Sequence, residues 1–165
     1  MSAPPDSARR ALLFGRRAPA LRPPWALDEA DFLDACTRCN ACVEHCPEHV
    51  LVRGAGGYAV FDPRMGECTF CGECASACEP HALDRSVQRE PWHLSASAGD
   101  ACLPRRGVVC SSCRDACPEQ AIAFPLTSRV PAPAIDAARC TGCGACVAAC
   151  PVDALVLHPR VTEVA

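Results

Sequence analysis

The sequence contains no lysine and few aromatic residues. All 16 basic residues are arginine, and aromatic side chains make up 5% of the 165 residues. We draw no functional conclusion from the missing lysine. The scarcity of aromatic residues excludes a large aromatic core, and two halves of about 60 residues each would be marginal on hydrophobic burial alone.

Long apolar runs are also missing. No run reaches the ~20 residues that a membrane-spanning helix needs. Arg9 and Arg10 precede a short apolar stretch, but Gly15, Arg16 and Arg17 interrupt it, so it is too short for an export signal. We therefore expect no transmembrane segment and a cytoplasmic location, where thiols stay reduced.

Several classes of functional site are absent. The sequence shows no pattern typical of a catalytic triad, a phosphate-binding loop or a pair of catalytic carboxylates, so we do not expect an enzyme. The formal net charge is −3, and basic residues are not interleaved with aromatic ones, so nucleic-acid binding is not indicated.

Cysteine, by contrast, is abundant. The 16 cysteines fall into four sets, each close to the spacing C-x2-C-x2-C-x3-C that is typical of bacterial [4Fe–4S] ferredoxins. The third set departs from this spacing, because its first gap is seven residues long. The sets are Cys36, Cys39, Cys42 and Cys46; Cys68, Cys71, Cys74 and Cys78; Cys102, Cys110, Cys113 and Cys117; and Cys140, Cys143, Cys146 and Cys150.

This spacing predicts four [4Fe–4S] clusters with crossed ligand sets. Two-residue gaps let one loop wrap three corners of the cube, and the fourth cysteine of such a motif ligates the other cluster in two-cluster ferredoxins. The predicted ligands are Cys36, Cys39, Cys42 and Cys78 for cluster 1; Cys68, Cys71, Cys74 and Cys46 for cluster 2; Cys102, Cys110, Cys113 and Cys150 for cluster 3; and Cys140, Cys143, Cys146 and Cys117 for cluster 4. The long gap after Cys102 leaves open whether that residue is a ligand.

Three other interpretations compete with iron–sulfur clusters. A disulfide scaffold is typical of short secreted chains, and no secretory signal is present. Structural zinc sites use two C-x2-C pairs separated by a longer loop, whereas here three cysteines lie within seven residues. Inert buried thiols would not recur at a fixed spacing. Iron–sulfur binding is therefore the favoured interpretation, and a zinc-dependent interaction module is the alternative that colour would distinguish.

The repeated sets predict an α+β fold made of two bacterial dicluster ferredoxin modules in tandem, with short strands and helices around the clusters. The predicted boundaries are an Arg/Pro-rich leader (1–27), a first module (28–84), a linker (85–101), a second module (102–160) and a C-terminal tail (161–165). The leader is either a docking segment or a solvated extension. If it is a docking segment, deleting residues 1–22 should weaken partner binding and leave the clusters intact.

Two smaller features are open to more than one interpretation. Arg105 and Arg106 lie in the seven-residue gap of the third set. They either influence a nearby cluster or a partner, or belong to an exposed loop, which we favour. His45 is adjacent to Cys46, and a solvated imidazole is favoured over one that tunes a cluster.

Motifs outside the cysteine sets carry a resemblance to a known family. The leader runs into Arg22-Pro23-Pro24-Trp25-Ala26, a Gly54–Gly57 turn precedes the second set, and the stretched third set ends in Cys113-Arg114-Asp115-Ala116-Cys117-Pro118. Over nearly its whole length the chain resembles the NapF family, the ferredoxin-type accessory proteins of periplasmic nitrate reductase systems. Cys78-Glu79-Pro80 departs from the family's regular Cys-Pro after the second set.

The resemblance implies a cytoplasmic iron–sulfur protein whose partner is the pre-export catalytic subunit of periplasmic nitrate reductase. It would support maturation of that subunit by cluster assembly or by reduction before export. The alternative hypothesis is an electron carrier, or an electron-transfer subunit that relays electrons to a terminal reductase, because four clusters in a row can conduct electrons. Reduction potentials of such clusters span about −700 to +450 mV, so sequence does not give the direction of electron flow.

Overall fold

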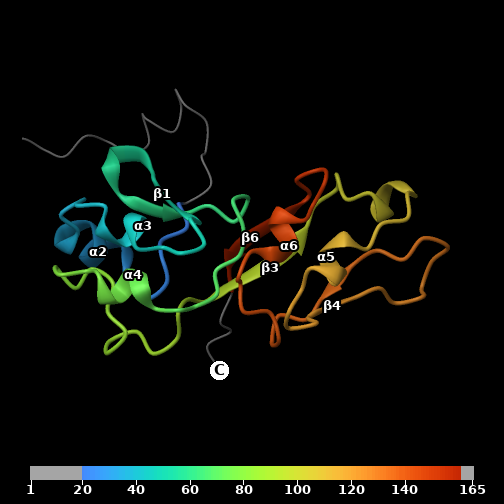
Figure 1. Cartoon of the computed structure of the whole chain (residues 1–165). Helices are drawn as coiled ribbons and strands as arrows, with labels where there is room; N and C mark the ends of the chain where they lie inside the picture. Colours follow the sequence, from blue (N-terminus) through green and yellow to red (C-terminus); the bar gives the residue numbers. More distant parts are fainter. Residues whose placement is uncertain (1–19, 161–165) are drawn as a thin grey trace, which may run out of the picture.

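The computed structural model describes residues 20–160, which form two small halves side by side (Figure 1). Each half contains two one-turn helices and a short hairpin. No helix in residues 20–160 is long and apolar enough to cross a membrane. In chain order the elements are α2 (Glu29–Ala35), α3 (Ala41–Glu44), β1 (Leu51–Arg53), η1 (Ala55–Gly57), β2 (Ala59–Phe61), α4 (Glu73–Ser76), β3 (Leu94–Ala98), η2 (Pro104–Arg106), α5 (Ser112–Asp115), β4 (Ile122–Ala123), β5 (Ala134–Ile135), α6 (Ala145–Ala148) and β6 (Leu155–Pro159).

The first half is built on an antiparallel hairpin. β1 pairs with β2, and Leu51 lies opposite Phe61. The predicted glycine turn connects these strands, and Gly56 and Gly57 adopt φ values of 71° and 81°. Side chains rarely tolerate these angles, so glycine permits the reversal of the chain.

The second half contains two strand pairs. β4 pairs with β5, with Ile122 opposite Ile135, in the position that corresponds to the first hairpin. β3 and β6 form the longest ladder within residues 20–160, from Leu94 opposite Pro159 to Ala98 opposite Leu155.

Strand β3 lies inside residues 85–101, which are predicted to be a linker. Because β3 pairs with β6, the last strand among the described residues, residues 94–98 form part of the second half. The first half is closed in a similar way, since Ala26 forms an isolated antiparallel bridge with Leu83. In both halves, the segment that pairs with the end of that half lies before the first cysteine of that half. Strand pairing thus includes residues that precede the predicted start of each module, at residue 28 or 102.

The end of the predicted leader is likewise part of the fold. Trp25 is 4% exposed, its amide donates a hydrogen bond to the Pro91 carbonyl 2.6 Å away, and Leu21 accepts one from the Phe61 amide. Pro23 and Pro24 are buried beside it. Residues 1–19 of the leader and the tail 161–165 lie outside the described residues.

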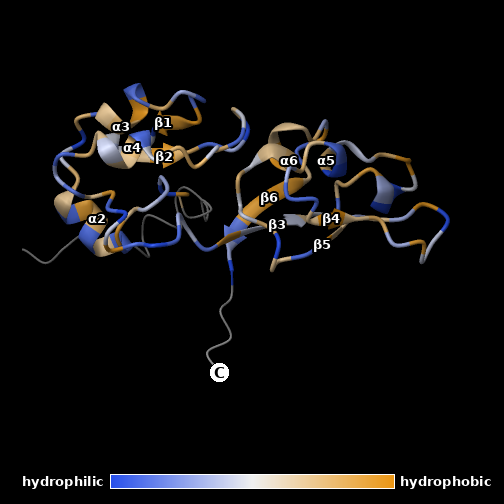
Figure 2. Ribbon diagram, turned by 60° about the horizontal axis from the view of Figure 1, so that its bottom comes forward, coloured by the Kyte–Doolittle hydropathy of each residue, from blue (hydrophilic) through white to orange (hydrophobic). Residues whose placement is uncertain are grey.

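Each half has its own small hydrophobic core. Phe32, Val50 and Leu83 are among the buried residues of the first, and Ile122, Val147 and Leu155 of the second. Figure 2 shows hydrophobic colouring on strands such as β1 and β6 and on helices α3 and α6, whereas α5 is hydrophilic. The predicted α+β fold is confirmed.

Candidate iron–sulfur sites

One-turn helices position the third cysteine of every set. Cys42, Cys74, Cys113 and Cys146 lie in α3, α4, α5 and α6, and the fourth cysteine follows each helix. Three of these helices begin after a residue in the left-handed conformation, namely Asn40, Gly72 and Gly144. This conformation turns the backbone sharply between the second and third cysteines. Ser111 has φ −135° instead, so the third loop is the irregular one, as predicted from its long gap.

The structure gathers the 16 cysteines around four cavities. Each cavity is lined by the first three cysteines of one set and the fourth cysteine of the other set in the same half. The groups are Cys36, Cys39, Cys42 and Cys78; Cys68, Cys71, Cys74 and Cys46; Cys102, Cys110, Cys113 and Cys150; and Cys140, Cys143, Cys146 and Cys117. These groups coincide with the four ligand sets expected from the sequence.

Backbone amides point at three of the four fourth cysteines. The amide of Leu83 lies 3.4 Å from Cys78 Sγ, that of Ala121 lies 3.4 Å from Cys117 Sγ, and that of Ala154 lies 3.2 Å from Cys150 Sγ. Amide hydrogen bonds to a cluster's sulfur ligands stabilise negative charge and help to set the reduction potential.

A repeated left-handed residue orients these amides. The residue three positions after every fourth cysteine has a φ value near 50°, although none of the four is glycine. This conformation is uncommon for residues with a side chain, so its recurrence marks a shared local structure. The four residues are His49, His81, Gln120 and Asp153.

Burial opposes ionisation of the thiols. It raises the pKa of Cys42 to about 11, with further contributions from the neighbouring thiolates of Cys78 and Cys36. The pKa values of Cys74 and Cys146 rise to about 12, mainly through burial. Thiolate is the form that binds metal. A bound cation must therefore offset the desolvation of four thiolates and the repulsion between them. Iron in a cluster is suited to this donor set.

Within residues 20–160, no group of three or more His, Cys, Asp or Glu side chains has the arrangement that would hold a single metal ion.

Comparison with known proteins agrees with this donor set. Residues 33–83 and residues 108–154 each match a family model described as a 4Fe-4S dicluster domain. The chain is 44% identical over 154 residues to the ferredoxin-type protein NapF of Escherichia coli K12, covering 91% of this chain and 93% of the relative. It is 40% identical over 139 residues to NapF of Haemophilus influenzae, covering 84% and 78%. The chain belongs to the NapF family of ferredoxin-type proteins.

More distant relatives carry another name. The methylamine utilization ferredoxin-type protein MauM of Paracoccus denitrificans is 37% identical over 151 residues, which cover 81% of this chain and 67% of that protein. NapF proteins therefore share their sequence pattern with ferredoxin-type proteins named for a different system.

The third set is the least regular in this NapF-family chain. The dicluster match begins at residue 108 and so leaves out Cys102. The structure nevertheless buries Cys102 at 5% exposure and places it on the same cavity as Cys110 and Cys113. The 3-10 helix η2 takes up the long gap and returns the chain to the cavity.

Neither of the two arginines in that gap lines the third cavity. Arg105 and Arg106 are exposed, and Arg105 lies 3.7 Å from the Asp100 carboxylate. The two arginines therefore lie in an exposed loop, as predicted. His45 is also exposed, with its Nδ1 2.9 Å from the carbonyl oxygen of Ala41 in the preceding turn.

The cysteine spacing gave no indication of how the two halves meet. Trp92, in the segment between the cysteine sets, contacts the cluster-binding loops of both halves. The only signal of this contact in the sequence was a tryptophan in a chain with few aromatic residues. The residues next to Trp92 gave no indication of which residues it contacts.

Proposed function

We propose that the chain binds four [4Fe–4S] clusters, each held by one of the four cysteine groups named above. The observation that carries this proposal is the arrangement of the cavities, since each is lined by three cysteines of one set and one of its partner set. Three of the four sites gain an amide donor to sulfur. Bound clusters would take up and release single electrons.

We further propose that the protein works in the cytoplasm on the catalytic subunit of a periplasmic nitrate reductase before that subunit is exported. It would support maturation by assembling or reducing the subunit's own iron–sulfur cluster. Support comes from the similarity to NapF proteins over nine-tenths of the chain. No residue here is assigned a catalytic role.

The residues of the chain have two tasks in this scheme. The buried cysteines Cys46 and Cys74 keep water from part of the site of cluster 2. Cys39 and Cys71 are exposed, which brings one corner of clusters 1 and 2 to the surface. A partner docked over such a corner would be close enough to exchange electrons.

A second candidate function is that of an electron carrier to a terminal reductase. It is favoured by the contact between the cysteine loops of the two halves, where the Cys68 amide donates to the Cys143 carbonyl over 2.8 Å. The relatives named for methylamine utilization also favour it, because they link the same sequence pattern to another system.

A strain that lacks this protein distinguishes the two functions. Periplasmic nitrate reductase is assayed with reduced viologen, which bypasses the physiological electron path, and separately with the native quinol donor. Loss of both activities supports maturation, because the reductase itself is then defective. Loss of only the quinol-dependent activity supports the electron carrier. Normal activity with both donors would reject nitrate reductase as the system served.

A further inference from the structure

The cluster-binding loops of the two halves touch directly. The Cys68 amide donates a hydrogen bond to the Cys143 carbonyl oxygen, 2.8 Å away. Both residues belong to cysteine groups, the first to cluster 2 and the second to cluster 4. The backbone atoms of two proposed iron ligands are thus joined by one hydrogen bond across the boundary between the halves.

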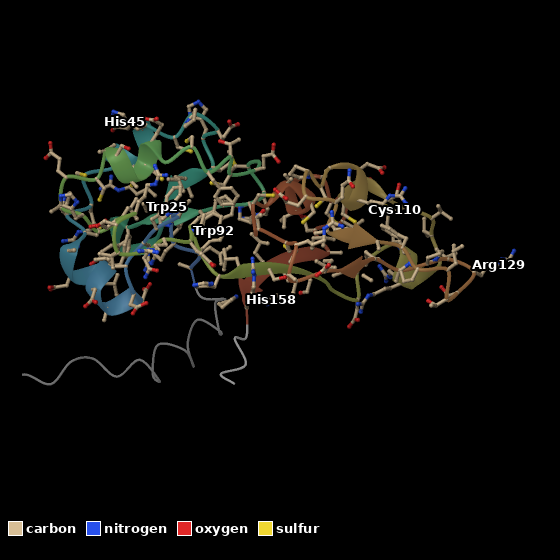
Figure 3. All side chains as sticks on the ribbon, turned by 90° about the horizontal axis from the view of Figure 1, so that it is seen from below. Trp25, His45, Trp92, Cys110, Arg129 and His158 are labelled. Atoms are coloured by element: carbon tan, nitrogen blue, oxygen red, sulfur yellow. The ribbon has the colours of Figure 1, made fainter. Side chains whose placement is uncertain are left out.

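Trp92 links the same two loops through its side chain. Its indole Nε1–H donates to the Thr141 carbonyl, 2.9 Å away, in the loop between Cys140 and Cys143. Its ring meets Phe70, in the loop between Cys68 and Cys71, edge to face at a centroid distance of 5.6 Å. It also packs at 4.8 Å against Phe61. Figure 3 shows Trp92 between the two halves.

Glycine allows this close approach. A Cβ on Gly144 would lie 2.9 Å from Pro63 Cβ and 3.0 Å from Phe61 Cζ, and a Cβ on Gly142 would lie 2.9 Å from Trp92 Nε1. Both glycines belong to the loop of cluster 4. A side chain at Gly144 would push the halves apart, and one at Gly142 would displace Trp92 and Leu94, so glycine at these positions favours contact between the loops.

All four cavities are lined within their own halves, but only those of clusters 2 and 4 include residues that Trp92 contacts, Phe70 and Thr141. Cluster 1 would lie among residues such as Phe32 and Pro80, and cluster 3 among residues such as Pro104 and Phe124. Clusters 2 and 4 are therefore the inner pair, and clusters 1 and 3 are at the two ends.

We propose that the contact of Trp92, Cys68 and Cys143 is an electron-transfer junction that joins the two dicluster halves into one chain of clusters in the order 1, 2, 4, 3. The inference rests on the proposed four-cluster assignment. In the transfer step one electron leaves a reduced cluster of one half and enters an oxidised cluster of the other. No bond forms and no proton moves. The first electron comes from a one-electron donor such as a reduced viologen or flavin.

The roles of the junction residues differ. Cys68 and Cys143 are proposed ligands, so the path runs through their thiolates and the hydrogen bond between their backbones. Trp92 is a positioning residue, because it holds the two loops in contact without lining any of the four cysteine cavities.

The first test keeps only the inner clusters. In the full chain, Cys39→Ser and Cys110→Ser together remove one ligand each from clusters 1 and 3. That variant is expected to retain eight iron atoms, which corresponds to two clusters. If it does, the electron paramagnetic resonance spectrum of the dithionite-reduced protein should show magnetic interaction between clusters 2 and 4. Adding Trp92→Ala should weaken the interaction. Two independent, non-interacting signals from the eight-iron variant would overturn the proposal.

A second measurement decides the matter if the double variant loses its inner clusters. Trp92→Ala is made in the otherwise unchanged chain, and amide hydrogen exchange is followed by mass spectrometry. We expect exchange at least about tenfold faster in residues 66–71 and 140–144, since loss of a net hydrogen-bond contribution near 1.4 kcal/mol corresponds to that factor. Unchanged protection in both loops would overturn the proposal.

Tyr58→Ala is the matched control. Like Trp92, Tyr58 is an aromatic residue that donates to a carbonyl, that of Leu33, but both partners lie in the first half. Tyr58→Ala should leave amide exchange in residues 140–144 and the magnetic interaction between clusters 2 and 4 unchanged. Trp92→Phe should keep part of the amide protection and part of the magnetic interaction. The four-cluster assignment is checked separately, because wild-type protein with fewer than about 16 iron atoms per chain would contradict that assignment and not the junction.

Discussion

The guanidinium of Arg22 forms a two-point ion pair with Glu29, with Nη2 2.6 Å from Oε1 and Nε 2.8 Å from Oε2. The same guanidinium lies over the ring of Phe32, 4.8 Å from its centroid. The Arg22 side chain is 17% exposed. These contacts fix the last leader arginine in the first half and hold α2 against it, so residue 22 is not available as part of a free docking segment.

Replacing Arg22 should therefore weaken the first half. Arg22→Ala loses a partly buried ion pair and a cation–π contact, and we expect it to lower the stability of the holoprotein by about 1 kcal/mol. Thermal unfolding of the cluster-loaded protein measures this. Arg64→Ala is the control, because Arg64 pairs with Asp62 at the surface and should change the midpoint little. Equal effects of the two substitutions would contradict the structural role of Arg22.

The docking prediction for the leader now concerns residues 1–19. Deleting residues 2–19 removes four arginines and should weaken binding to the pre-export nitrate reductase subunit without loss of iron. Extending the deletion through residue 27 also removes Trp25, whose side chain is buried, and should destabilise the first half. Affinity and iron content of both truncations are measured side by side. Unchanged affinity of the shorter truncation would remove the leader from the docking surface.

Iron removal should unfold the protein. Each half has a small core, and the cysteines line cavities that the proposed clusters would fill, so we expect binding of the metal and folding to be coupled. Chelation under reducing conditions should abolish near-ultraviolet circular dichroism and the cooperative thermal transition. A cooperative melt of iron-free protein with native secondary structure would contradict this.

Cys102 should prove to be an iron ligand despite its distant position in the sequence. Its thiol is buried on the third cavity beside Cys110 and Cys113. Cys102→Ala should lower the iron content by up to about four atoms and remove cluster 3. Ser112→Ala is the control, because its hydroxyl lies 3.7 Å from Cys110 Sγ without being a proposed ligand. Four intact clusters in Cys102→Ala would exclude Cys102 as a ligand.

The left-handed residue after each fourth cysteine offers a test of local strain. Gln120 is exposed and has a φ value of 48°. Gln120→Gly should raise stability by up to about 1 kcal/mol, because glycine adopts this conformation without strain, and Gln120→Val should lower it. Gln88→Gly, at a position outside the left-handed region, should be destabilising. Thermal unfolding of the three holoproteins gives the comparison, and a destabilised Gln120→Gly would be the contrary result.

Most of the site was predictable because cluster geometry depends on short-range spacing. The two-residue gaps show which cysteines share a loop. The order of the four cysteine sets along the chain shows which loops belong to the same half. The spacing therefore predicts that Cys46 groups with the second set, and the structure places Cys46 on that cavity.

The boundaries of the halves were not predictable from the same pattern. Strand β3 contains Ser95 and Ser97 among small residues, and nothing in that composition indicates a strand whose partner lies about 60 residues later. The contacts of Trp92 with Phe70 and Thr141 also depend on packing between halves, which local spacing does not encode.

The pairing of β3 with β6 has a consequence for synthesis on the ribosome. Residues 94–98 leave the ribosome long before their partners at 155–159. The first half has its closing residue, Leu83, much earlier. The first half can therefore close while the second still lacks its final strand, so the two halves can complete their folding in order from the N-terminal side.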